Sequence, residues 1–253
     1  MVNIKSKREI ELMKHAGHVN YLCHEQLKAH IAPGITTSEL NRIAHDFIIS
    51  HECSPSFLNY DGFPGSICTS INDEVVHGIP NNRKLKEGDI ISIDIGVKYK
   101  GYHSDAARTH AVGTISEEKA NLIKYTEESF YEGLKYVKEG ARVGDISAAI
   151  EKYARAHNLG VVEELVGHGV GTNLHEEPDV PNFGIANSGM RLKSGMVIAI
   201  EPMLNLGTKK IEILDDEWTI VTKDGKDSSH YEHTVLVTED GYEILTGENK
   251  IYG

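Results

Sequence analysis

Apolar residues recur at helical spacing in the first part of the chain. Residues 6–9, Ser-Lys-Arg-Glu, have the spacing of a capping box, in which the serine and glutamate side chains bond the first free amides of a helix. Apolar positions three or four residues apart follow as far as Leu27, so a long first helix is expected. Pro33-Gly34 interrupts this pattern, and Thr36 with Glu39 caps a second helix.

A period of two replaces the helical period in the middle of the chain. Between residues 90 and 97, apolar side chains alternate with polar ones, and Asp94 belongs to the polar set. This alternation predicts a strand, because successive side chains of a strand point to opposite faces of the sheet. Residues 98–101 are expected to form a four-residue turn, and a hairpin closed there sets Asp94 opposite Asp105.

The same two periods predict the remaining elements. Helices are expected over residues 117–137 and 145–158, with Glu139-Gly140 between them. Runs rich in β-branched residues alternate with loops of Pro, Gly, Asn and Asp elsewhere in the chain, and these runs predict short strands. The expected strands are residues 66–71, 75–77, 196–203, 212–221 and 230–238.

Two parts of the chain resemble each other. Residues 85–94 align with residues 192–201, and the helix entry at 33–40 aligns with 139–146 at nearly the same shift. Helices followed by strands in both parts predict a pseudo-twofold α+β domain. The expected arrangement is a single domain, residues 1–253, with halves of roughly 1–113 and 114–253.

Composition and charge exclude several functional classes. The chain has 26 basic and 38 acidic residues, a formal charge of -12, which opposes a broad nucleic-acid or anionic-membrane surface. Cys23, Cys53 and Cys68 are odd in number and lack CxxC spacing, so neither a disulfide framework nor a zinc ribbon is expected. The chain also lacks a membrane-length apolar run and a signal peptide, and we expect a cytoplasmic protein with reduced thiols.

Two opposed aspartates in a hairpin need an explanation. Directly opposed side chains have Cβ atoms about 4.5–5.5 Å apart, where like charges destabilise the strand pair. Asp94 and Asp105 are compatible with a solvated hairpin edge, with an acid dyad that shares one proton, or with a multivalent cation bound between them.

The repeat in the chain bears on this choice. It matches Asp94 to Glu201, and the last expected strand adds Glu232, so four carboxylates converge on the centre between the halves. His168, within a glycine-rich segment, supplies a nitrogen. Four such carboxylates without a cation repel one another, which favours a metal over the acid dyad. An oxygen-rich set with one imidazole suits Mn, Fe(II) or Co better than structural zinc.

Specific motifs follow one another along nearly the whole chain. They are HGIP at 77–80, DIGVKYKGYHSDAART at 94–109, GHGVG at 167–171, HEEP at 175–178, IAIEPM at 198–203 and YEHTVLVT at 231–238. Together these motifs resemble the methionine aminopeptidases of the short, type I form. The resemblance implies the pita-bread (creatinase/aminopeptidase) fold, a curved antiparallel sheet covered by helices.

The resemblance also implies a ligand set and catalytic roles. Two divalent ions, Co, Mn or Fe(II), are expected to bind Asp94, Asp105, His168, Glu201 and Glu232. Asp105 and Glu232 would bridge the two ions. Glu201 would act as general base toward the attacking water, His175 would steady the tetrahedral intermediate, and His77 would hydrogen-bond the scissile amide.

A pocket for the methionine side chain is implied as well. Its walls are expected to be Tyr60, Phe63, Cys68, Leu174 and Trp218, with His77 and His175 also contacting the substrate. Apolar and aromatic walls suit a flexible thioether. Phe57 and Leu174 stand where Cys and Phe are expected in relatives, and His230 stands where a glutamine often precedes Tyr-Glu-His.

The implied activity is removal of the initiator methionine from nascent polypeptides when the second residue is small. The partners implied are these nascent chains and, transiently, the ribosome. We expect a cytoplasmic monomer that binds neither membranes nor nucleic acid sequences. Two alternatives stay open: a proline-directed peptidase of the same fold, and a non-catalytic peptide-binding module, although the latter class should have lost ligands that this chain retains.

Overall fold

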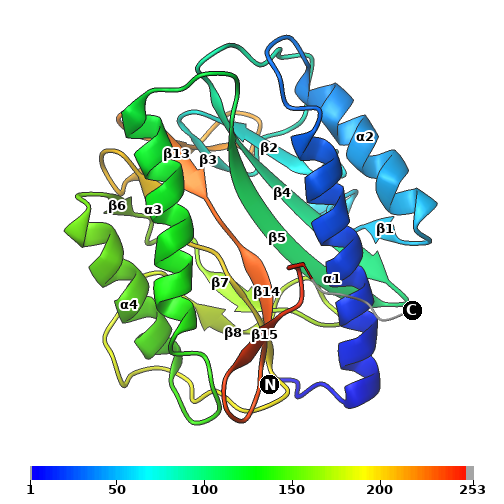
Figure 1. Cartoon of the computed structure of the whole chain (residues 1–253), viewed down its shortest axis with the longest axis vertical. Helices are drawn as coiled ribbons and strands as arrows, with labels where there is room; N and C mark the ends of the chain where they lie inside the picture. Colours follow the sequence, from blue (N-terminus) through cyan, green and yellow to red (C-terminus); the bar gives the residue numbers. More distant parts are fainter. Residues whose placement is uncertain (1, 249–253) are drawn as a thin grey trace.

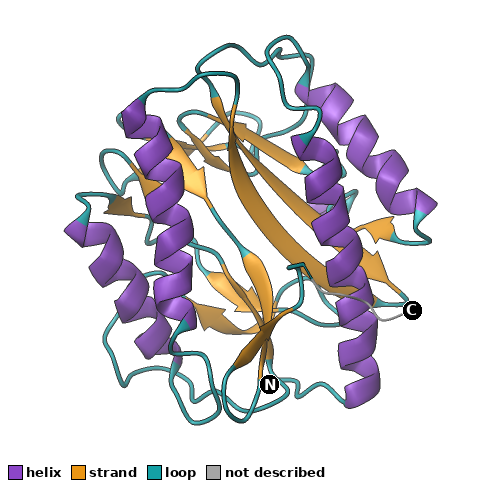
Figure 2. Cartoon of the chain, in the orientation of Figure 1, coloured by secondary structure: helices purple, strands orange, loops and turns teal. Residues whose placement is uncertain are grey.

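The computed structural model describes residues 2–248, in which four long helices lie on one side of the strands (Figure 1). They form two pairs, α1 with α2 and α3 with α4, as Figure 2 shows. The helices are α1 (Lys7–Lys28), α2 (Thr37–Ser50), α3 (Glu117–Leu134) and α4 (Val143–Ala156). The expected α+β class is confirmed.

The strands pair in antiparallel fashion throughout the described residues. A short 3-10 helix, Tyr60–Gly62, lies between the first two of them. In chain order the strands are β1 (Ser54–Pro55), β2 (Cys68–Ile71), β3 (Glu74–Val76), β4 (Ile90–Tyr99), β5 (Tyr102–Ala111), β6 (Gly160–Val161), β7 (Gly167–Gly169), β8 (Glu176–Val180), β9 (Val197–Ile200), β10 (Met203–Asn205), β11 (Ile211–Ile213), β12 (Ile220–Thr222), β13 (Ser228–His230), β14 (His233–Val237) and β15 (Tyr242–Ile244).

The two largest sheets join through the edge of β5. One sheet contains β1, β4 and β2 with β5 beside β4, and the other has the order β15-β14-β9-β7-β8. Ala107 on β5 exchanges backbone hydrogen bonds of 2.9 and 3.3 Å with Glu232. Two residues further along, the Thr234 hydroxyl accepts a 2.8 Å hydrogen bond from the Asp105 amide and donates to the Asp105 carbonyl. These contacts align the carboxylate-bearing strands of both halves.

Each helix pair packs on one face of its own sheet. Ile91, Ile93 and Ile95 of β4 are fully buried against residues of α1 and α2. Residues of α3 and α4 pack in the same way against β9 and β14. Burying one such aliphatic side chain stabilises a fold by about 1.5–3 kcal/mol. Because side chains alternate along a strand, the polar set that includes Asp94 faces away from the helices.

The helix predictions are confirmed, with small differences at the ends. Both N-terminal capping boxes form, at Ser6 with Glu9 and at Thr36 with Glu39. The third helix ends at Leu134, three residues before its expected end, and the fourth begins at Val143, two residues before its expected start.

The three expected strands near the C-terminus are each two strands. The run 196–203 divides into β9 and β10 at Glu201-Pro202, because proline has no amide hydrogen to continue the ladder. The run 212–221 divides into β11 and β12 at a turn in which Asp216 accepts hydrogen bonds from two backbone amides. The run 230–238 divides into β13 and β14, and β15 was not expected.

The expected hairpin register is wrong by two residues. Tyr99 pairs with Tyr102, so the turn contains only Lys100 and Gly101, whose φ angles are 45° and 91°. Two positive φ angles match the right-handed twist of a two-residue hairpin turn. Asp94 therefore lies opposite Ala107 rather than Asp105. A shift of two preserves the face of every side chain, so both aspartates still point to the same side.

Candidate metal centre

Five side chains of metal-binding type converge from different strands on the helix-free face of the sheet. Asp94 and Asp105 lie on β4 and β5, Glu201 follows β9, Glu232 lies between β13 and β14, and His168 is the middle residue of β7. Asp105, Glu232 and His168 are 3%, 2% and 8% exposed. This burial contradicts the interpretation of a solvated hairpin edge.

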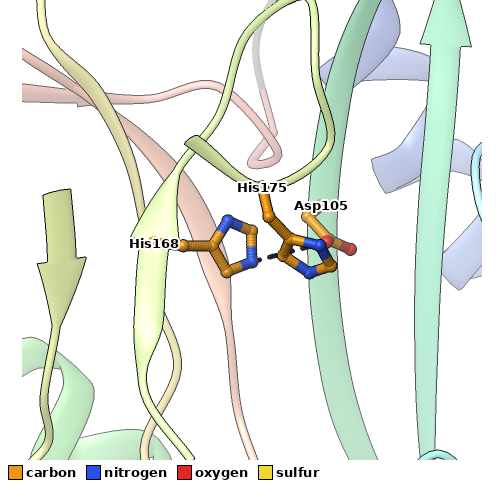
Figure 3. A group of neighbouring side chains, drawn as sticks. All are labelled: Asp105, His168 and His175. Carbon is orange, nitrogen blue, oxygen red and sulfur yellow. Dashed lines mark ion pairs between the residues drawn. The ribbon is translucent and has the colours of Figure 1, made fainter. Parts of the chain in front are cut away.

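The distances between these side chains fit ligands of shared ions. His168 Nε2 lies 3.5 Å from Glu201 Oε1 and 3.9 Å from Asp105 Oδ2. His168, Glu201 and Glu232 each offer a ligand atom within 4.8 Å of the others, and so do Asp105, His168 and His175. Figure 3 shows the latter three side chains facing one another.

Two glycines allow His168 to face the carboxylates. A Cβ atom on Gly167 would lie 2.4 Å from the Ala199 carbonyl oxygen, and one on Gly169 would lie 2.3 Å from the Glu177 carbonyl oxygen. Contacts below about 3 Å are prohibitive, so only glycine permits β8 and β9 to approach β7 this closely. The glycines of this segment therefore let the backbone of β7 lie close to the neighbouring strands.

Burial and mutual repulsion favour the protonated forms of the carboxylates. Burial raises the pKa of Asp94 from its ordinary 3.8 to about 7. Burial, and then the charges of neighbouring carboxylates, raise the pKa values of Asp105, Glu201 and Glu232 well above their usual range. Burial lowers the pKa of His168 to about 3, so its imidazole is neutral and able to bind a metal.

A divalent cation fits this set of donors. Asp94 Oδ1, Asp105 Oδ1 and Glu232 Oε1 are buried without a hydrogen-bond partner. Among the residues that line this pocket in the described part of the chain, none is a lysine or arginine. Buried, unpaired carboxylate oxygens are costly, and a bound cation both pairs them and replaces their protons.

Two further histidines line the same pocket. His77 has a φ of 60°, an uncommon value for a residue with a side chain and one that clusters at functional sites. Burial lowers its pKa to about 4. His175 Nδ1 lies 2.7 Å from the Tyr60 hydroxyl, and its ring centroid is 4.2 Å from that of His168. Both imidazoles therefore line the pocket that the carboxylates also line.

An apolar cluster forms the rest of the pocket wall. Phe63 and Trp218 meet edge to face with their ring centroids 5.1 Å apart. Phe57, which the sequence singled out only as a departure from related sequences, is 7% exposed and belongs to the same cluster. The wall consists of Phe57, Tyr60, Phe63, Cys68, Leu174 and Trp218.

One residue beside the cluster was noted in the sequence without a consequence. His230 is 2% exposed, and its Nε2 atom lies 3.8 Å from carboxylate oxygens of both Glu201 and Glu232. Residues two apart in an extended segment share a face, so the spacing of His230 from Glu232 was a signal of this proximity.

None of the helices in the described residues is both long and apolar enough to cross a membrane.

Comparison with known proteins gives a consistent set of relatives. Residues 11–239 match the model of metallopeptidase family M24. The chain is 53% identical to methionine aminopeptidase 1 of Bacillus subtilis (strain 168), over 97% of this chain and 99% of that one.

Solved structures show the same relation in three dimensions. The crystal structure of methionine aminopeptidase from Rickettsia prowazekii has a TM-score of 0.96 at 41% identity, and the match covers 98% of this chain and all of that one. The Xaa-Pro dipeptidase from Bacillus anthracis shares the fold, with a TM-score of 0.78 at 24% identity, but this chain covers only 62% of it. The expected pita-bread fold is confirmed.

We predict that Mn(II) stabilises the metal-free protein more at pH 7.5 than at pH 5.5. The folded carboxylates have raised pKa values, so between about pH 4 and 7 the folded state binds protons that the unfolded chain has lost, and its stability falls as pH rises. Metal ions replace these protons. At a free Mn(II) concentration of roughly 100 times its Kd, the melting temperature of the protein should therefore rise by about 5–10 °C at pH 7.5.

Thermal denaturation at the two pH values tests this expectation. Glu232→Gln should reduce the stabilisation, whereas Glu239→Gln, at an exposed glutamate, should retain it. An equal shift at both pH values, or none at either, would contradict the electrostatic account.

Proposed function

This chain belongs to metallopeptidase family M24, and we propose how its clustered carboxylates and histidines take part in removing the first methionine of a peptide. It is a metallo-aminopeptidase, a hydrolase that cleaves the peptide bond after an N-terminal methionine. The expected family and reaction are confirmed. The observation that carries the detailed proposal is a cluster of five ligand-type side chains beneath an apolar pocket wall.

The site takes divalent metal ions, and we infer that it holds two of them, as Mn, Fe(II) or Co. One would be bound by His168, Glu201 and Glu232, and the other by Asp94, with Asp105 and Glu232 bridging both. Oxygen ligands with few nitrogens suit these metals. When bound, such ions lower the pKa of a water molecule to near neutrality and polarise the carbonyl oxygen under attack.

Glu201 is the residue that we assign to proton transfer. Its carboxylate lies at the pocket floor, 3.5 Å from His168 Nε2, and is partly exposed to the pocket. It takes the proton of the attacking water and returns it to the nitrogen of the leaving amine. A carboxylate positioned within reach of that water suits both steps, first as general base and then as general acid.

His77 and His175 act as neutral hydrogen-bonding groups in this proposal. Burial lowers the pKa of each, so neither carries a charge at pH 7. If the Tyr60 hydroxyl donates to His175 Nδ1, the ring proton lies on Nε2, which can donate to the oxygen of the tetrahedral intermediate. His77 hydrogen-bonds the scissile amide and orients it for attack.

The apolar wall selects the methionine side chain. Phe63 and Cys68 are buried in one apolar cluster, and Trp218 packs against it, which suits an unbranched thioether that packs its sulfur against aromatic rings. Phe57 adds a second phenylalanine to this cluster. We propose that the pocket leaves room for only a small second residue in the substrate.

The wider biological setting is also a proposal. The substrates are nascent polypeptides that begin with methionine, reached in the cytoplasm, with transient ribosome association and a monomeric enzyme. The formal charge of -12 supports the absence of sequence-specific nucleic-acid binding. Residues 1–253 would form one catalytic domain of two related halves, roughly 1–113 and 114–253, of which residue 1 and residues 249–253 lie outside the described structure.

We predict that the metal-stripped protein does not hydrolyse Met-Ala-Ser and that added Mn(II) restores hydrolysis. Met-Lys-Ser, with a large second residue, and Ala-Pro-Ser, without methionine, should be cleaved much more slowly under the same conditions. Release of the first amino acid is followed by chromatography. A preference for Ala-Pro-Ser would indicate a proline-directed peptidase, and no cleavage with several metals would favour a peptide-binding module.

We also predict that His77→Ala lowers turnover by about 10²-fold or more, the usual effect of losing a hydrogen bond made in the transition state. The metal content, measured by elemental analysis, should stay unchanged because His77 belongs to none of the ligand groups. His30→Ala, at an exposed histidine after α1, is the control and should retain wild-type turnover. Loss of metal from His77→Ala would overturn the assigned role.

A further inference from the structure

His230 has a buried imidazole nitrogen to which the described residues supply no hydrogen bond. The backbone of this residue is fixed at the end of β13, because its amide donates a 3.0 Å hydrogen bond to the Thr109 hydroxyl and its carbonyl accepts one of 2.9 Å from the same group. The side chain is 2% exposed, and Nε2 has no hydrogen-bond partner among the described residues. A buried polar atom without a partner needs an explanation, such as a bound water molecule or ion.

The surroundings of this atom match those of His168. His230 Nε2 lies 3.8 Å from Glu201 Oε2 and 3.8 Å from Glu232 Oε2, whereas His168 Nε2 has carboxylate oxygens at 3.5 and 3.9 Å. These separations exceed the usual hydrogen-bond limit of about 3.2 Å. Two atoms that each lie about 2.1 Å from one ion are roughly 3.0–4.2 Å apart when their bonds meet at about 90–180°.

The two imidazoles belong to two different groups of ligands. His168 is grouped with Glu201 and Glu232, whereas His230 is grouped with Asp94 and Glu232, and in each group the ligand atoms lie within 4.8 Å of one another. Glu232 is common to both groups, as expected of a carboxylate that bridges two ions. His168 and His230 therefore each offer a nitrogen to one of two neighbouring sites that share Glu232, in addition to the group of Asp105, His168 and His175.

We propose that His230 Nε2 is a sixth protein ligand of the dinuclear centre and binds the ion held by Asp94 and Glu232. This proposal rests on the proposed function in one respect: the site must hold two metal ions. A nitrogen in an otherwise all-oxygen site raises its affinity for Co(II) relative to Mn(II), because imidazole is a stronger ligand for the later metals. Both sites should consequently fill with Co(II) at similar concentrations.

Proton NMR of the protein loaded with Co(II) tests this ligand directly. Each histidine bound to paramagnetic Co(II) gives a strongly shifted signal from the proton on its other ring nitrogen, and this signal is lost in D₂O when that proton exchanges. With two equivalents of Co(II), the wild-type protein should give two such signals. His230→Gln should lose one of them, and His168→Gln should lose the other. His110→Gln changes a histidine that lines a separate cleft with Tyr21 and Lys28, and it should retain both signals.

Calorimetric titration with Co(II) supplies a second readout. His230→Gln should weaken binding of one of the two ions by about 10-fold or more, since even changes beside a ligand commonly cost 10–100-fold in affinity. Binding of two ions with a single shifted signal in the wild type, or two signals retained in His230→Gln, would overturn the proposal. Binding of only one ion by the wild-type protein would also overturn the proposal. This measurement does not depend on whether any variant folds.

These measurements use no peptide, so the two proposals fail separately. Two shifted signals in a protein that does not cleave Met-Ala-Ser would leave His230 as a ligand and overturn the proposed function. Cleavage of Met-Ala-Ser by a protein with one shifted signal would support the proposed function and overturn the assignment of His230 as a ligand.

Discussion

Mutual repulsion among buried carboxylates is the constraint on which the rest of the structure depends. Asp105 and Glu232 are almost fully buried, Asp94 and Glu201 adjoin them, and no described residue that lines the pocket is a lysine or arginine. In the metal-free protein, burial raises the pKa values of all four, and neighbouring carboxylate charges raise those of Asp105, Glu201 and Glu232 further, so these groups must bind either protons or cations. The fold holds them together because each lies on or beside a strand of a sheet that is packed against helices on its opposite face.

Because side chains alternate along the strands, the side chains on one face pack the core and those on the other face line the pocket. Isoleucines of β4 fill the core under α1 and α2, while Asp94, between Ile93 and Ile95, faces the pocket. The hydrogen bonds between Thr234 and the backbone of Asp105 then align the strands of the second half with those of the first. A site built in this way on paired strands is rigid, so its ligand atoms are already in position before a metal binds.

Local signals in the sequence were sufficient for the helices and for the face on which the carboxylates lie. The capping boxes and the alternation around Asp94 depend on neighbouring residues alone, so they are visible in one sequence. The hairpin register was wrong because the backbone of Lys100 adopts a positive φ, for which its side chain gives no signal. The contacts of His230 with Glu201, which follows β9, and with Thr109 on β5 could not be predicted either, because these residues are far away in the sequence. Its spacing from Glu232 indicated a shared face but not an unpartnered nitrogen.

The central claim is that this carboxylate cluster is organised to bind two divalent ions, and anomalous X-ray scattering from crystals grown with Mn(II) tests it most directly. Data collected on both sides of the manganese absorption edge locate the ions without reference to activity. The account predicts two peaks, one among His168, Glu201 and Glu232 and one beside Asp94, about 3.5–4 Å apart as is usual for two-metal sites. No peak at saturating Mn(II), or peaks only on surface carboxylates, would contradict it.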